Sequence, residues 1–151
     1  MPNQLHHVII RSHSSAEFIR FLTDVVGMTL LHTFRVPGEL LVTTMDWPPN
    51  DGAEVSILGN GEAGMIEILD VPEELRPTVP EGLAAMSFLT DDYTKVQQDA
   101  HAFATDVTPF EALMPGVELF KCTVGGVLIE FMGSYAADEA NQVGEHTASA
   151  S

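Results

Sequence analysis

The chain has 151 residues, 45% of them hydrophobic, a length and composition that suit one globular domain or two small modules sharing a core. Six basic residues against 22 acidic ones give a net charge of −16, which disfavours nucleic acids and anionic membranes as partners. The single cysteine, Cys122, excludes an intrachain disulfide, and with no signal peptide or membrane-spanning apolar run in the sequence it predicts a cytoplasmic protein.

The first half of the chain predicts a β-α-β-β-β unit over residues 1–70. A β-branched strand is expected at 5–11. Ser14 then offers an N-cap, apolar residues follow at helical spacing, and Gly27 stops the helix. Four further extended stretches follow in order, at 29–36, 40–45, 53–58 and 65–71.

The second half, 83–133, repeats this order. Residues 71–82 contain three prolines and are expected to link the halves. A strand at 83–89 precedes a helix that starts near Asp92, and three closing strands are expected at 107–110, 117–124 and 127–132. The remaining residues, 134–151, have no apolar periodicity and predict a disordered tail.

One glutamate recurs in the last strand of each half. Glu67 and Glu130 each lie alone within a short apolar run, where an isolated ionised carboxylate is costly to bury. The repetition indicates a duplicated module whose two carboxylates converge on one site. The plainer alternative is that both glutamates lie on the solvent-facing side of edge strands. The apolar residues on both sides of each glutamate argue against it.

The halves differ by one segment, 38–52. His7 and Glu67 are 60 positions apart, whereas Ala85 and Glu130 are 45 apart, and the excess equals the 15 residues of this segment. It carries the only tryptophan, Trp47. Insertions of this kind often form pocket walls, so we expect the segment to border the cavity, with packing on its own module as the alternative.

The order and spacing of several short motifs resemble the vicinal oxygen chelate superfamily, which includes glyoxalase I, methylmalonyl-CoA epimerase, extradiol dioxygenases and bleomycin-resistance proteins. The resemblance covers roughly residues 5–133. It implies an α+β fold in which two βαβββ modules form curled mixed sheets around a central cavity. The motifs that carry it are the two glutamate strands, Leu-His-His-Val at 5–8, Asp-Val-Val-Gly-Met at 24–28 and Ser-Phe-Leu-Thr-Asp-Asp at 87–92.

The resemblance also implies four metal-ligand positions, which fall on His7, Glu67, Ala85 and Glu130. Alanine has no donor atom, so Ala85 departs from the family pattern. The other three could hold Mn²⁺, Mg²⁺, Fe²⁺ or Zn²⁺, with water or substrate oxygens in the open positions. Alternatively, the site has lost its metal and the glutamates serve as bases or polar anchors.

Three further residues are candidates for the substrate pocket. Arg11 shares strand parity with His7, and Ser87 shares it with Ala85, so both would point toward the cavity. Trp47 would contribute from the insertion. No role is assigned to His6 or Lys121.

Two functions follow from the resemblance. The first is a small-molecule lyase, isomerase or epimerase, in which Glu130 removes a proton next to a carbonyl and Glu67 is its partner. The second is a non-catalytic protein of the bleomycin-resistance type that sequesters a cationic or neutral small molecule. The resemblance also implies a homodimer, or a dimer-like pairing of modules within one chain.

Overall fold

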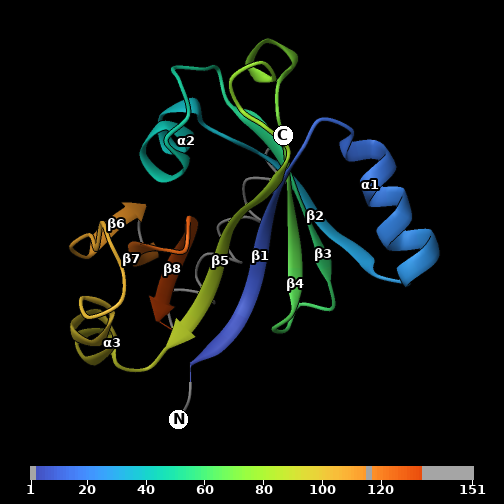
Figure 1. Cartoon of the computed structure of the whole chain (residues 1–151). Helices are drawn as coiled ribbons and strands as arrows, with labels where there is room; N and C mark the ends of the chain where they lie inside the picture. Colours follow the sequence, from blue (N-terminus) through green and yellow to red (C-terminus); the bar gives the residue numbers. More distant parts are fainter. Residues whose placement is uncertain (1–2, 115–116, 134–151) are drawn as a thin grey trace.

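The computed structural model describes residues 3–114 and 117–133, and the tail predicted over 134–151 lies outside the described residues. Both halves have the expected β-α-β-β-β order, and one extra helix interrupts the first (Figure 1). The first half contains β1 (Gln4–Ser12), α1 (Ser15–Phe21), η1 (Leu22–Val26), β2 (Thr29–Val36), α2 (Gly38–Met45), β3 (Ala53–Gly59) and β4 (Met65–Asp70). The short η2 (Glu73–Leu75) leads into β5 (Gly82–Thr90), α3 (Tyr93–Ala100), β6 (Glu111–Met114), β7 (Val117–Val124) and β8 (Val127–Gly133).

The extra helix, α2, corrects the extended stretch predicted at 40–45. Leu41 and Thr44, nearly one turn apart, are both buried along this helix. The hydroxyls of Thr43 and Thr44 donate to the carbonyls of Glu39 and Leu40, at 3.0 and 2.7 Å, and so return to the preceding turn. β-Branched residues favour strands in isolation, but here helical packing onto the core outweighs that preference.

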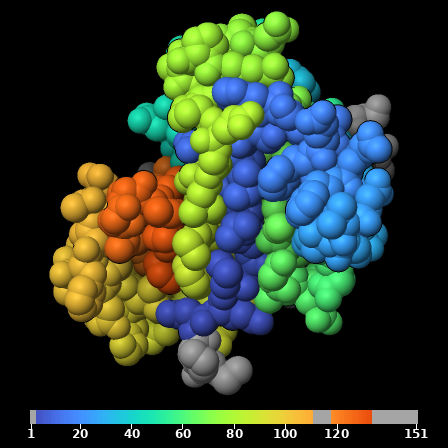
Figure 2. Space-filling view, turned by 45° about the vertical axis from the view of Figure 1, so that its right-hand side comes forward, coloured from blue at the N-terminus to red at the C-terminus, as the bar shows by residue number. Residues whose placement is uncertain are grey.

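The strands form one mixed sheet, in the order β2-β3-β4-β1-β5-β8-β7-β6. The sheet is open, with β2 and β6 at its edges, so the expectation of curled sheets closing around a cavity is corrected to a single continuous sheet. The two halves meet through the antiparallel pair β1–β5, which runs down the centre of the molecule (Figures 1 and 2). This junction leaves neither central strand with a free edge.

The strand register repeats between the halves. β1 pairs in parallel with β4, and β5 pairs in parallel with β8. Glu67 lies beside Ile9 in the first pair, and Glu130 lies beside Ser87 in the second. The two glutamates therefore hold equivalent positions, related by an approximate two-fold axis between β1 and β5.

The two faces of the sheet carry different cores. The inner face, which bears Glu67 and Glu130, is covered by α2 and by the segment 71–82. This predicted linker contributes three buried side chains, so it is part of the core. The buried inner cluster comprises Ile9, Leu41, Trp47, Ala53, Val55, Leu69, Val71, Leu75, Val79, Ala84 and Ala85.

The outer face is covered by α1 and α3. Leu22, Leu58 and Ile68 form its buried cluster beneath α1. Beside α3, Phe110 packs edge-on against Phe120, which stacks on Phe131. None of the described helices has the length and apolar character needed to cross a membrane.

Candidate functional site

The Glu67 carboxyl group lies on the inner face against the imidazole of His7. Its Oε2 is 3.3 Å from His7 Nε2, and 20% of the Glu67 side chain is exposed. Burial raises the pKa of Glu67 from 4.5 to about 7, because a carboxylate loses hydration there. A carboxyl group with this pKa can both accept and donate a proton at neutral pH.

The Glu130 carboxyl group is more deeply buried, with 6% of the residue exposed. The hydroxyl of Ser87 donates to its Oε1 at 2.6 Å. Burial raises the pKa of Glu130, and the negative charge of Glu67 acts in the same direction. The Ser87 hydrogen bond and the charges of His7 and Lys121 oppose that rise. The two carboxyl groups are thus close enough for the charge on one to affect the other.

His7 connects this pair to a second imidazole. Its Nδ1 is 2.9 Å from Nδ1 of His6, and its Nε2 faces Glu67. Burial lowers the pKa of His7, with the charge of Glu130 acting the other way, so the neutral ring is favoured. A neutral imidazole has one donor and one acceptor nitrogen, so the partner at Nδ1 determines whether Nε2 donates to Glu67 or accepts from it.

The four positions implied as metal ligands lie on the inner face of the sheet. Among the described residues, no three His, Cys, Asp or Glu side chains are arranged to hold a metal ion. Glu67 faces His7, whereas Glu130 accepts the hydrogen bond from Ser87. Ala85 is fully buried between Ile9 and Leu128 and supplies no donor. A Mn²⁺, Mg²⁺, Fe²⁺ or Zn²⁺ site at His7, Glu67 and Glu130 therefore stays a prediction.

The predicted pocket residues Arg11 and Trp47 lie farther along the inner face. A terminal nitrogen of Arg11 donates to the carbonyl of Leu83 at 3.2 Å. Trp47 is only 4% exposed and belongs to the buried inner cluster, which contains residues of both modules. Ser87, by contrast, lies at the centre of the site through its bond to Glu130.

Lys121 is a site residue that the sequence analysis missed. It lies beside Glu130 in the register of β7 and β8. Its Nζ donates to the carbonyl of Thr43 in α2 at 2.8 Å, so the insertion of the first half is tied to the second half next to the site. The sequence could have indicated Lys121 if the register of the β7–β8 hairpin had been known, because that register places Lys121 beside Glu130 on the same face of the sheet.

A separate hollow of about 610 Å³ lies near the start of α1 and contains none of the predicted site residues. Its sheet residues include Ser56, Ile68 and Asp70, which alternate with inner-face residues and so belong to the outer face. The Asp70 carboxylate already accepts a hydrogen bond from Ser15 at 2.8 Å. This hollow is distinct from the site that contains the two glutamates.

Comparison with known proteins agrees with this architecture. The family described as the Glyoxalase/Bleomycin resistance protein/Dioxygenase superfamily matches residues 4–131. The chain belongs to this superfamily. No curated protein sequence matches it.

Solved structures with the superfamily fold are similar over nearly their whole length. A hypothetical protein from Bacillus halodurans C-125 is 17% identical, with 89% of this chain and 96% of that chain covered and a TM-score of 0.63. A Streptomyces coelicolor methylmalonyl-CoA epimerase variant in complex with 2-nitronate-propionyl-CoA is 18% identical, with 87% and 94% covered and a TM-score of 0.60. Methylmalonyl-CoA epimerase from Mycobacterium tuberculosis is 17% identical, with 86% and 87% covered and a TM-score of 0.56. At these identities the likeness establishes the fold alone.

Proposed function

We propose that the protein is an epimerase-type isomerase that moves a proton at a carbon atom next to a carbonyl group. The observation that carries this proposal is the pair Glu67 and Glu130, two buried carboxyl groups at equivalent positions of the two modules. Inverting a carbon centre requires one group that removes a proton and a second that returns it from the opposite side. Two carboxyl groups related by an approximate two-fold axis on one face of the sheet suit that requirement.

In one direction, the carboxylate of Glu130 takes the proton from the carbon atom. The electron pair of the broken C–H bond moves into the carbonyl group to give an enolate. The carboxylic acid of Glu67 then donates its proton to the opposite face of that carbon, and the electron pair returns to form the new C–H bond. The roles exchange in the reverse direction. Burial supports the acid role of Glu67, whose pKa of about 7 leaves it partly protonated near neutral pH, and the Ser87 hydrogen bond favours the ionised form of Glu130.

The neighbouring side chains support these two roles, a base at Glu130 and an acid at Glu67. Ser87 stabilises the ionised form of Glu130 by its hydrogen bond. His7 holds the carboxyl group of Glu67 in place through its Nε2.

The net charge of the chain bears on the size and charge of the substrate that it can bind. Acyl-CoA compounds are bound by the epimerases with this fold, but a net charge of −16 disfavours the phosphates of CoA. We therefore expect a smaller carbonyl compound or thioester. The same charge favours the second candidate, a non-catalytic protein that binds a cationic small molecule.

We further expect a homodimer.

Deuterium incorporation tests the proposal. The protein is incubated in D₂O with methylmalonyl-CoA and, separately, with the N-acetylcysteamine thioester of methylmalonate, which lacks the nucleotide phosphates. The expected result is protein-dependent loss of the Cα–H proton signal, faster with the small thioester. If neither the thioesters nor other 2-substituted carbonyl compounds exchange above the buffer rate, the binding-protein function replaces the enzyme.

A further inference from the structure

Two buried nitrogen atoms have no hydrogen-bond partner in the described part of the chain, Nε of Arg11 and Nε1 of Trp47. Both are donors only, since neither a guanidinium group nor an indole N–H accepts a hydrogen bond. A buried donor left unpaired costs about 1–3 kcal/mol. Two such donors therefore indicate a place where an acceptor group binds.

The two donors border the same part of the inner face. Trp47 belongs to the inner cluster together with Ile9 and Leu69. Arg11 lies beside Leu69 in the register of β1 and β4, and it follows Ile9 by two residues. Side chains two residues apart on a strand share a face. Arg11 thus lies at the Leu69 end of the face that carries the two glutamates, and Trp47 packs in the same buried cluster as Leu69.

The charge of Arg11 is unusual in this chain, which has only six Lys and Arg residues against 22 Asp and Glu residues. Within the described residues, two of the other cations form ion pairs with carboxylates, Arg20 with Asp24 and Lys95 with Asp99. Arg11 donates to the carbonyl of Leu83 and, like Arg35, Arg76 and Lys121, forms no ion pair within the described residues. A guanidinium group prefers a carboxylate, which accepts two parallel hydrogen bonds from it.

We propose that Arg11 and Trp47 bind a carboxylate group of the substrate. Arg11 supplies the charge, and the indole N–H of Trp47 fixes the direction of one oxygen atom. Strands rise about 3.3 Å per residue, so Leu69 lies about 7 Å from Glu67 along β4. A carbonyl compound with a carboxylate a few bonds from its acidic C–H would reach both places. The inference rests on the proposed function in assigning this acid as the substrate of Glu67 and Glu130.

Fluorescence of Trp47 tests the subsite directly, because Trp47 is the only tryptophan in the chain. The full chain is titrated with malonate, and with the neutral malonamide, at an ionic strength held constant with sodium chloride. Malonate should give a saturable change in the emission of Trp47, and malonamide none. No saturable change with malonate, or the same change with chloride alone, would overturn the proposal as a nonspecific ion effect.

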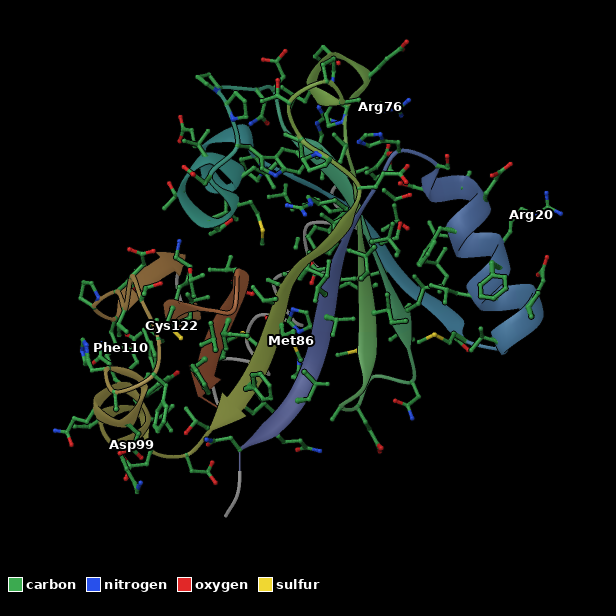
Figure 3. The ribbon with its side chains drawn as sticks, in the orientation of Figure 1. Arg20, Arg76, Met86, Asp99, Phe110 and Cys122 are labelled. Atoms are coloured by element: carbon green, nitrogen blue, oxygen red, sulfur yellow. The ribbon has the colours of Figure 1, made fainter. Side chains whose placement is uncertain are left out.

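Two charge-matched variants identify the cation. Arg11→Gln should weaken malonate binding about tenfold or more. Arg20→Gln removes the same charge from the exposed side of α1, where Arg20 points away from the sheet (Figure 3), and should leave the affinity unchanged. An unchanged affinity in folded Arg11→Gln, or an equal loss in Arg20→Gln, overturns the proposal. If circular dichroism shows that Arg11→Gln is unfolded, Arg11→Met replaces it, and affinity equal to that of the native chain then has the same meaning.

A third variant separates this proposal from the proposed function. Glu67→Gln should abolish interconversion of the substrate enantiomers but retain malonate binding, since Glu67 takes no part in the subsite. A chain that binds malonate without exchanging any carbon acid would sink the epimerase function and keep the subsite. A chain that exchanges carbon acids without binding malonate would do the reverse.

Discussion

Glu67 and Glu130 hold the same register position in their two modules, but only Glu130 receives a hydroxyl hydrogen bond. The residue beside Glu130 is Ser87, whose hydroxyl donates to it at 2.6 Å, whereas the residue beside Glu67 is Ile9. An aliphatic side chain cannot stabilise a carboxylate. The duplicated fold thus offers two carboxyl groups of matched geometry and different surroundings, which is the arrangement that a two-base reaction needs.

Glu67→Gln should change the pH dependence of stability. The pKa of Glu67 is raised in the fold from 4.5 to about 7. The unfolded chain therefore releases this proton at lower pH, and the free energy of unfolding falls as pH rises from about 4.5 to about 7. The linked loss is up to about 3 kcal/mol. A glutamine does not titrate, so Glu67→Gln should exceed the native chain in stability at pH 8 and match it at pH 4.

Urea unfolding of the variant and of the native chain at both pH values measures this difference. The control is Glu54→Gln, which changes an exposed carboxyl group on the neighbouring β3. The difference in the free energy of unfolding between Glu54→Gln and the native chain should be the same at pH 4 and pH 8. A Glu67→Gln difference that does not vary with pH would mean that Glu67 titrates normally in the fold.

Ser87→Ala should destabilise the fold by about 1–3 kcal/mol, because it leaves a buried carboxyl group without its donor. The Ser87 hydrogen bond lowers the pKa of Glu130, so it favours the ionised form. The loss should therefore be larger at pH 8 than at pH 5. Ser56→Ala removes another buried serine hydroxyl, on the outer face, and serves as the matched control with no such pH dependence. Equal losses of stability at pH 8 and pH 5 for Ser87→Ala would contradict the claim that the Ser87 hydrogen bond favours the ionised form of Glu130.

Much of the fold follows from local patterns in the sequence. β-Branched runs marked the strands, and Gly27, with φ of 85°, ends the first helical segment where the sequence predicted. The matched glutamates located the repeat and its inner face. These features depend on residues close together in the chain, which is why a sequence reveals them.

Other features depend on contacts between distant segments. The bond of Ser87 to Glu130 joins residues 43 positions apart, and the tie of Lys121 to Thr43 spans 78 positions. The β1–β5 pairing contains two register shifts, which no periodicity predicts. Trp47 precedes Pro48 and Pro49 and so resembles part of an exposed turn, yet tertiary packing buries it.

Ala85→His tests whether the site has merely lost one metal ligand. Ala85 is fully buried within the inner cluster, so an imidazole there would have to displace packed side chains. We expect a loss of stability of about 1–3 kcal/mol and no gain in affinity for Mn²⁺, Fe²⁺ or Zn²⁺ in calorimetric titration. About a tenfold rise in metal affinity over the native chain would instead restore the His-Glu-His-Glu set as a metal centre.

A homodimer is expected in solution. The open sheet leaves β2 at an edge, and apolar side chains remain exposed nearby, with Phe21 53%, Val25 70% and Leu30 43% exposed. Sedimentation at micromolar concentration should give about twice the 16.3 kDa mass of the chain, and Val25→Glu should shift it to the monomer. A monomeric mass for the native chain would contradict this expectation.

The central claim, that Glu67 and Glu130 work from opposite faces of one carbon atom, is tested most directly by following each enantiomer of an active substrate separately in D₂O. The native chain should interconvert the enantiomers, with deuterium entering both. Glu67→Gln and Glu130→Gln should each lose interconversion, and each should still exchange the proton of one enantiomer, a different one in the two variants. Loss of exchange for both enantiomers in one variant, with full interconversion in the other, would contradict the two-base account.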